Sequence, residues 1–318
     1  MNETIAQSPK PLRSGGRASR TLKSMLKNKY MYLLMLPGML YYIVFRYTPM
    51  WGVIISFQDY QPFLGIGGSP WVGFKHFERL FTEPTFFMLF RNTIVLFLLN
   101  ILIYFPVPIL LALMLNEVRV QWFKRSVQTI IYIPFFMSWV IIVSLSYVLF
   151  TTERGIVNEL LVMLGLEKIS FLTRPEWFRP LYIMQVIWRE AGWGTIIYLA
   201  AIAMVDPQLY EAGRMDGASR WRQIWHITLP SIRTVIVILL LLRLGDVLEL
   251  GFDHVFLMAN GLNREVAEIF DTYVYDAGIR QGQFSYSAAI GFFRSAVGLL
   301  LVVLTNWFVR RLGEEGLF

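Results

Sequence analysis

The sequence contains no cysteine and has few charged residues for its length. Of its 318 residues, 16% are charged and 56% are hydrophobic. Without cysteine the chain can form neither a disulfide nor a reactive thiol. Soluble domains are usually about 25% charged, and a soluble fold has too little interior to hide so large an apolar fraction. We therefore predict that a lipid bilayer surrounds much of the chain.

The chain also lacks the residue patterns of an enzyme. It has no G-x-x-x-x-G-K-[ST] phosphate-binding loop, so we expect it to bind neither ATP nor another cofactor itself. Its 3 histidines fall in connections on both sides of the predicted membrane and cannot form one metal site. A membrane-embedded enzyme would need clustered catalytic groups, and the sequence shows none. We predict a protein without a catalytic, metal or cofactor site.

Several apolar runs are long enough to cross a membrane. A helix needs roughly 20 apolar residues to span the hydrocarbon core. None of the runs alternates apolar and polar residues, which argues against the strands of a membrane barrel. The sequence therefore predicts an all-α membrane protein with six transmembrane helices, at residues 30–50, 90–114, 127–150, 181–204, 231–250 and 285–309.

The placement of lysine and arginine sets the orientation of these helices. The net charge is +7, and basic residues are concentrated before Tyr30 and in the connections after the second and fourth runs. The last outward loop, 251–284, is acidic on balance. Cytoplasmic segments carry the excess of basic residues, so we expect both termini in the cytoplasm. The same distribution is typical of a membrane protein and not of a nucleic-acid-binding face.

Three parts of the chain follow from these patterns: a basic cytoplasmic tail at 1–29, a six-span domain at 30–312 and a short C-terminal tail at 313–318. In the first tail, three apolar residues share one helical face: Leu22, Met25 and Leu26. One interpretation is a short helix lying on the membrane surface. The other is an ordinary charged segment that leads into the first span.

A polar loop at 206–230 separates the fourth and fifth runs. Asp206 and Pro207 are typical of a helix start, because Asp caps free amides and Pro fits the first position. Gly217 is typical of a helix end, since glycine adopts a left-handed conformation at little cost. We predict a helix at about 207–216 and a second one that ends at Pro230. Such an ordered polar loop suits docking onto another protein.

The loop carries a spaced motif: Glu-Ala-Ala, three residues, Gly, nine residues, Ile, one residue, Leu-Pro. The positions that match it are Glu211, Ala212, Gly217, Ile227, Leu229 and Pro230, while Gly213 replaces the second Ala. This pattern resembles the cytoplasmic loop of binding-protein-dependent ABC importer permeases. The resemblance covers residues 30–312. In the first span and the first outward loop, the segments 32–37, 47–52 and 71–77 are similar to the oligosaccharide subgroup of that family.

The resemblance implies a function and a set of partners. Permeases of this family lie in the bacterial cytoplasmic membrane and pair with a second, often non-identical permease subunit. Two ATPase subunits bind ATP and Mg, and an external solute-binding protein delivers the saccharide. The segment from Glu211 to Gly217, which includes Asp216, would form the helix that couples to the ATPase. As a whole the chain looks most like permeases for alginate and related uronate saccharides.

Ionisable side chains inside predicted spans are functional candidates, because burying a charge in lipid is costly. The ionisable candidates are Arg189, Glu190, Arg243, Asp246, Glu249 and Arg294. Trp193 is added to them as an aromatic candidate. One interpretation is a solute path, since guanidinium groups bind carboxylates and aromatic rings stack on sugars. The other is internal pairing, for example of Arg243 with Asp246 one helical turn away. An ion-coupled secondary transporter of a polar or anionic solute is the alternative function.

Overall fold

The computed structural model describes residues 27–245 and 251–311. Within these residues the chain is helical, and an isolated bridge between Gln58 and Trp71 is the one β-type pairing. The prediction of an all-α chain is therefore confirmed for this part. The chain forms two compact units, 1–54 and 55–318. Predictions for the two tails fall outside the described residues, except for 27–29.

The first unit contains one uninterrupted helical run over the first predicted span. It consists of α2 (Lys29–Tyr42), η1 (Ile43–Tyr47) and α3 (Thr48–Met50). Every residue of this run is exposed, including large apolar side chains such as Leu34. A helix that is apolar all round normally lies in a membrane or against another chain.

Long apolar helices dominate the second unit. Two of them could cross a membrane alone: Thr85–Glu117, made of α6 (Thr85–Leu99), η3 (Asn100–Tyr104) and α7 (Pro106–Glu117), and α19 (Phe284–Arg311). Two bent pairs also qualify if each counts as one span. One joins Gln121–Phe136 (α8, Gln121–Tyr132, and η4, Ile133–Phe136) to α9 (Trp139–Phe150). The other joins Arg220–Ser231 to α15 (Arg233–Gly245). The described residues thus contain two to four candidate spans, and the count of six stays a prediction.

The fourth predicted run lies in α11 (Pro175–Ala203), a helix of 29 residues. The remaining helices are short: η2 (Trp51–Phe57), α4 (Gly65–Gly68), α5 (Lys75–Thr82), α10 (Ile156–Met163), α12 (Pro207–Met215), α13 (Arg220–Gln223), η5 (Ile224–Thr228), α14 (Leu229–Ser231), α16 (Phe252–Met258), α17 (Arg264–Ala267), α18 (Phe270–Tyr275) and η6 (Asp276–Arg280).

Prolines shape the long helices in two ways. A proline removes one backbone donor and clashes with the carbonyl four residues earlier. At Pro49, Pro106 and Pro230 the helix continues, and a π-helical turn ends two residues before each proline. At Pro134, by contrast, the chain bends by 103° between η4 and α9. A widened turn therefore absorbs some prolines, whereas others break the helix.

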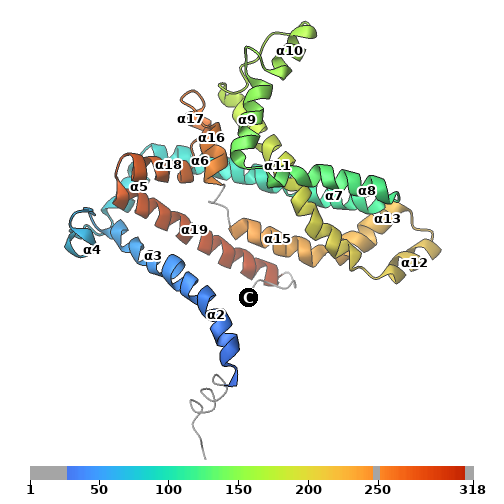
Figure 1. Ribbon diagram of the computed structural model, residues 1–318, viewed down its shortest axis with the longest axis horizontal. Helices are drawn as coiled ribbons and strands as arrows, with labels where there is room; N and C mark the ends of the chain where they lie inside the picture. The colour runs from blue at the N-terminus through green and yellow to red at the C-terminus, as the bar shows by residue number, and fades with distance from the viewer. Residues whose placement is uncertain (1–26, 246–250, 312–318) are drawn as a thin grey trace, which may run out of the picture. The chain divides into compact units, whose positions relative to one another are not determined.

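Glycines allow α11 to lie close to its neighbours in the second unit. Helix α11 packs against α7 and α8, and Figure 1 shows it crossing this part of the bundle. A Cβ atom on Gly192 would lie 1.9 Å from the carbonyl oxygen of Ile131 in α8, and one on Gly194 would lie 3.0 Å from Cγ of Pro108 in α7. Only a residue without a side chain fits at Gly192, so this position fixes where α11 sits.

Candidate functional sites: the polar loop and the central cavity

The first half of the polar loop at 206–230 folds as the sequence predicts. Helix α12 begins at Asp206, whose Oδ1 accepts a hydrogen bond from the backbone amide of Gln208 at 2.9 Å. The helix ends before Gly217, which has a left-handed φ of +71°. The amide of Ala218 donates to the carbonyl of Gly213 at 2.8 Å and closes the end of the helix.

The second half departs from the prediction at its end. Helical structure runs through α13, η5 and α14 and stops only after Ser231, so the predicted end at Pro230 is wrong by one residue. The π-helical turn at 224–228 accommodates the proline and lets the helix continue past it. A bend of 60° then separates this segment from α15.

Contacts between the halves of the motif explain its spacing. A Cβ on Gly213 would lie 3.0 Å from Cδ1 of Ile227, so a small residue is needed opposite this isoleucine. The hydroxyls of Tyr210 and Thr228 are hydrogen-bonded at 2.9 Å. Leu229 packs against a buried cluster in α7, α11 and the start of α15. The loop is therefore a folded unit that is anchored to the membrane helices.

The outer surface of the loop is open. Glu211, Ala212 and Asp216 are exposed, and Met215 is 88% exposed. An apolar side chain so exposed in a polar loop suggests contact with another protein. The motif residues thus divide into two groups: Gly213, Ile227 and Leu229 hold the loop together, and the acidic residues and Ala212 face outward.

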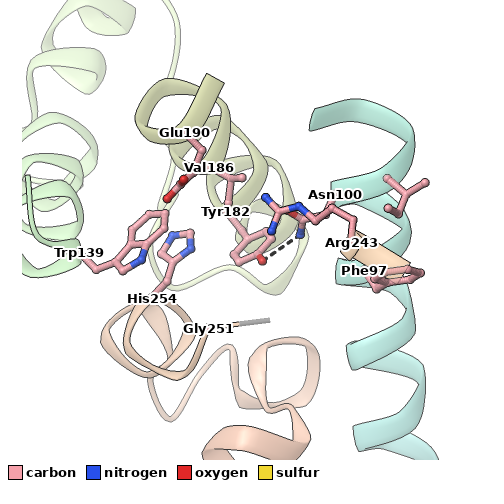
Figure 2. Close-up of a pocket in the computed structure, with 10 residues that line it drawn as sticks. Phe97, Asn100, Trp139, Tyr182, Val186, Glu190, Arg243, Gly251 and His254 are labelled. Atoms are coloured by element: carbon pink, nitrogen blue, oxygen red, sulfur yellow. Dashed lines mark hydrogen bonds between the residues drawn. The ribbon is translucent and has the colours of Figure 1, made fainter. Parts of the chain in front are cut away.

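A cavity of about 230 Å³ lies between helices of the second unit. Figure 2 shows Glu190 of α11 and Arg243 of α15 on its walls, together with residues from α6, η3, α9 and α16. The lining residues are Phe97, Asn100, Ile101, Trp139, Tyr182, Val186, Glu190, Arg243, Gly251 and His254. A second cavity of about 240 Å³ is also lined by Glu190 and Arg243, together with Trp193. The two charged residues therefore lie where the two cavities meet.

His254 is held in one wall of this cavity by rings and hydrogen bonds. Its ring stacks between Trp139, at a centroid distance of 3.7 Å, and Tyr182, at 4.7 Å. Its Nε2 lies 2.7 Å from Oε1 of Gln185, whose amide donates to Ser146. Burial, together with the cation of Arg189, lowers the pKa of His254 to about 3. The imidazole is therefore neutral and rigid at physiological pH.

The charged residues predicted for the solute path fall into different surroundings. Arg189 is ion-paired with Glu190, and its guanidinium lies 4.6 Å from the ring of Trp139. Arg294 pairs with Asp271 of α18 at 2.5 Å, a partner that sequence reasoning did not identify. Arg243 lies over the ring of Tyr104 at 5.1 Å. Asp246 and Glu249 lie outside the described residues.

The structure thus brings Glu190, Trp193 and Arg243 together, with Arg189 behind Glu190, and leaves Arg294 in a separate pair. Sequence reasoning did not identify Asn100, Tyr182 and His254 as cavity residues. The sequence does hint at Asn100, because it places a polar amide within an apolar run, and this amide is buried in the structure. No group of three or more potential metal ligands occurs among residues 27–245 and 251–311.

Comparison with known proteins identifies the family. The family model described as "Binding-protein-dependent transport system inner membrane component" matches residues 105–314. The chain is 67% identical over 302 residues to the polygalacturonan/rhamnogalacturonan transport system permease protein YteP of Bacillus subtilis (strain 168), covering 95% of this chain and 94% of that protein. It is 52% identical over 308 residues to protein LplB of the same organism, covering 97% of each.

Solved structures agree with this match. The crystal structure of a bacterial alginate ABC transporter in complex with alginate pentasaccharide-bound periplasmic protein contains a chain with a TM-score of 0.87 and 39% sequence identity. The alignment covers 94% of this chain and 100% of that one. A second structure, of a bacterial ABC transporter involved in the import of the acidic polysaccharide alginate, contains a chain with a TM-score of 0.86 and 40% sequence identity.

These matches confirm the resemblance to oligosaccharide importer permeases that the loop motif carries. The alternative of an ion-coupled secondary transporter gains no support from them. The matched family segment includes the whole polar loop and seven of the ten residues that line the cavity, and the relatives extend the match over most of the chain. The chain belongs to the family of inner membrane components of binding-protein-dependent transport systems.

Proposed function

We propose that this chain is the permease subunit of an ATP-driven importer of acidic oligosaccharides built from uronate units. The observation that carries the proposal is the 67% identity, over nearly the full length, to a permease named for polygalacturonan and rhamnogalacturonan. The similarity to chains of alginate transporters supports it, because alginate too is an acidic polysaccharide. Both lines of similarity point to cargo with regularly repeated carboxylates.

The central cavity would hold part of this cargo. Within the described residues no carboxylate lies within ion-pairing distance of Arg243, whereas Arg189 is engaged by Glu190. A guanidinium group binds a carboxylate through two parallel hydrogen bonds, so Arg243 is suited to a uronate. Trp193, in the adjoining cavity, offers a ring for a sugar face. Asp246 lies three positions after Arg243 in the sequence and would modulate its charge.

The cytoplasmic loop would transmit force from the ATPase subunits. Glu211 and Ala212 on α12 and Asp216 just after it face outward, and Gly217 closes the helix. The same loop is anchored to the membrane helices through Leu229. A rigid element fixed at one end and exposed at the other can convert movement of a partner into movement of helices. ATP and Mg would be bound by the two ATPase subunits and not by this chain.

The remaining parts of the assembly follow the family. The partner permease would be a non-identical subunit that supplies the other half of the pathway. An external solute-binding protein would deliver the saccharide. The chain would cross the bacterial cytoplasmic membrane six times with both termini inside. The exposed apolar run at 29–50 is consistent with burial in lipid or against a partner subunit.

The test is uptake into proteoliposomes that contain the whole transporter, with its binding protein outside and ATP inside. We expect uptake of an oligogalacturonate to depend on ATP and to persist when ion gradients are collapsed. The methyl ester of the same oligosaccharide, which has no free carboxylate, should be a poor substrate. Equal uptake of acid and ester would contradict the proposed cargo, and uptake that needs an ion gradient in place of ATP would contradict the proposed mechanism.

A further inference from the structure

Two arginines lie side by side where α6, α11 and α17 meet. Arg91 of α6 and Arg179 of α11 both donate to Oδ1 of Asn92, at 3.4 Å and 3.5 Å. Arg91 also donates to the backbone carbonyl of Glu265 at 3.3 Å. In the described part of the chain neither arginine forms an ion pair with a carboxylate. Two cations therefore share one neutral acceptor.

The arrangement is rigid but incomplete. Asn92 is fully buried, and its Nδ2 donates to the backbone carbonyls of Glu265 and Glu268 at 2.8 Å and 3.0 Å. These bonds orient Oδ1 toward the two arginines. The Nε of Arg179 is buried and has no hydrogen-bond partner within the described residues. Arg91 and Arg179 also repel each other electrostatically. A buried donor and two adjacent cations call for an anion.

Asn92 and Arg179 lie on the same helix faces as residues that line the central cavity. Asn92 of α6 and Asn100 of the adjoining η3 are eight residues apart and share one face. In α11, Arg179 is followed on its own face by Tyr182 and Glu190. The side chain of Asn100 donates a hydrogen bond to the hydroxyl of Tyr182 at 3.0 Å. Arg179 donates to the side chain of Asn92, so two polar contacts join these helices one after the other along their length. Arg91 lies about 9 Å along α6 from Phe97 in the cavity lining, toward the predicted outer end of that helix.

We propose that Arg91 and Arg179 form a carboxylate-binding site at the outer approach to the cavity, which receives one uronate unit of the cargo. The inference rests on the proposed function. Two guanidinium groups can hold a carboxylate through charge-assisted hydrogen bonds, and the buried Asn92 keeps them in place. A saccharide with a carboxylate on each unit can contact this site and Arg243 with different units. The line of polar contacts from Arg179 and Asn92 to Tyr182 and Asn100 at the cavity wall favours cargo over a lipid headgroup as the anion.

Transport by variants tests the site. In the assembled transporter, R91Q and R179Q should raise the KM for an oligogalacturonate roughly tenfold or more, because each loses a charge-assisted hydrogen bond. R179K should show an intermediate KM, because lysine keeps the positive charge but lacks the planar guanidinium group that makes two parallel hydrogen bonds. Arg174→Gln is the matched control, because Arg174 is an exposed arginine just before α11 and lies outside the cluster. It should leave the KM unchanged.

Direct labelling separates this site from a fault in folding or in the proposed cargo. Phenylglyoxal should modify Arg179 in the purified wild-type transporter, as read by mass spectrometry, and oligogalacturonate should slow the reaction while its methyl ester does not. If the wild type prefers acid to ester but R91Q and R179Q keep both KM and preference, this inference is wrong and the proposed function stands. If the wild type carries acid and ester equally, the proposed function is wrong. Protection by vesicles of anionic phospholipid, without sugar, would identify a lipid-phosphate site and overturn the inference.

Discussion

The polar loop and the central cavity are built in opposite ways. The loop at 206–231 is one short stretch of chain, and its defining contacts join residues fewer than 20 positions apart, such as Tyr210 and Thr228. The cavity draws its walls from helices spread over residues 97–254. Local contacts place the outward-facing Glu211 in the loop, whereas helix packing places Glu190 and Arg243 in the cavity. The cavity should therefore be far more sensitive to packing changes than the loop.

The packing of α11 gives the largest expected effect. In Gly192→Ala the new methyl group would meet the carbonyl of Ile131 at 1.9 Å, and this backbone atom cannot move aside cheaply. We expect a loss of about 3 kcal/mol of stability, at the upper end for overpacking. Thermal unfolding of the purified transporter measures it. Gly291→Ala in α19 is the control, because a Cβ there has open space. Equal stability of the two variants would contradict the role given to Gly192.

The loop should respond in activity and not in stability. Glu211→Ala removes an exposed carboxylate from α12 and leaves the contacts of Gly213, Tyr210 and Leu229 in place. We expect stimulated ATPase activity to fall roughly 10- to 100-fold, as for the loss of a typical coupling free energy. The melting temperature should not change. The exposed Gln208, on the same helix, supplies the control Gln208→Ala. Full stimulation in Glu211→Ala would remove this residue from the coupling surface.

The same contrast explains how far sequence reasoning reaches. Asp206 and Gly217 predict the ends of α12 correctly, because capping and a left-handed glycine are local properties. The end at Pro230 is missed by one residue, because a π-helical turn is not visible in the sequence. In the cavity, the residue types Arg189, Arg243 and Arg294 are apparent but their partners are not. Which carboxylate reaches which arginine depends on helix packing, so the pair of Arg294 with Asp271 could not be predicted.

Substitutions of Arg243 and Arg294 should have different effects, because the two arginines have different surroundings. Arg243→Gln should raise the KM for an acidic oligosaccharide about tenfold, since one charge-assisted contact with cargo is lost. Arg294→Gln should instead lower stability, because it leaves the carboxylate of Asp271 without its ion-pair partner. Uptake kinetics and thermal unfolding of both variants separate these outcomes. If both variants changed KM alike and neither changed stability, the distinction drawn between the two arginines would be wrong.

The smallest expected effect concerns a long-range contact outside the cavity. Glu83, just after α5, accepts hydrogen bonds from Tyr286 of α19 at 2.7 Å and from Arg79 at 2.7 Å. Burial alone would raise the pKa of Glu83, but the hydrogen bonds from Tyr286 and Arg79 outweigh it and hold the pKa below its usual value of 4.5. A carboxyl whose pKa is lower when folded stabilises the fold above its unfolded pKa. That stabilisation is lost as the pH falls through the folded pKa.

Replacing this carboxyl should therefore make stability less dependent on pH. Glu83→Gln should be less stable than the wild type at pH 7, by up to about 1 kcal/mol, and the difference should vanish once the pH lies below the folded pKa. Thermal unfolding as a function of pH measures both. Glu78→Gln, at an exposed residue of α5, controls for the loss of one negative charge. A pH profile of Glu83→Gln parallel to that of the wild type would show that the contacts with Tyr286 and Arg79 add no pH-dependent stability.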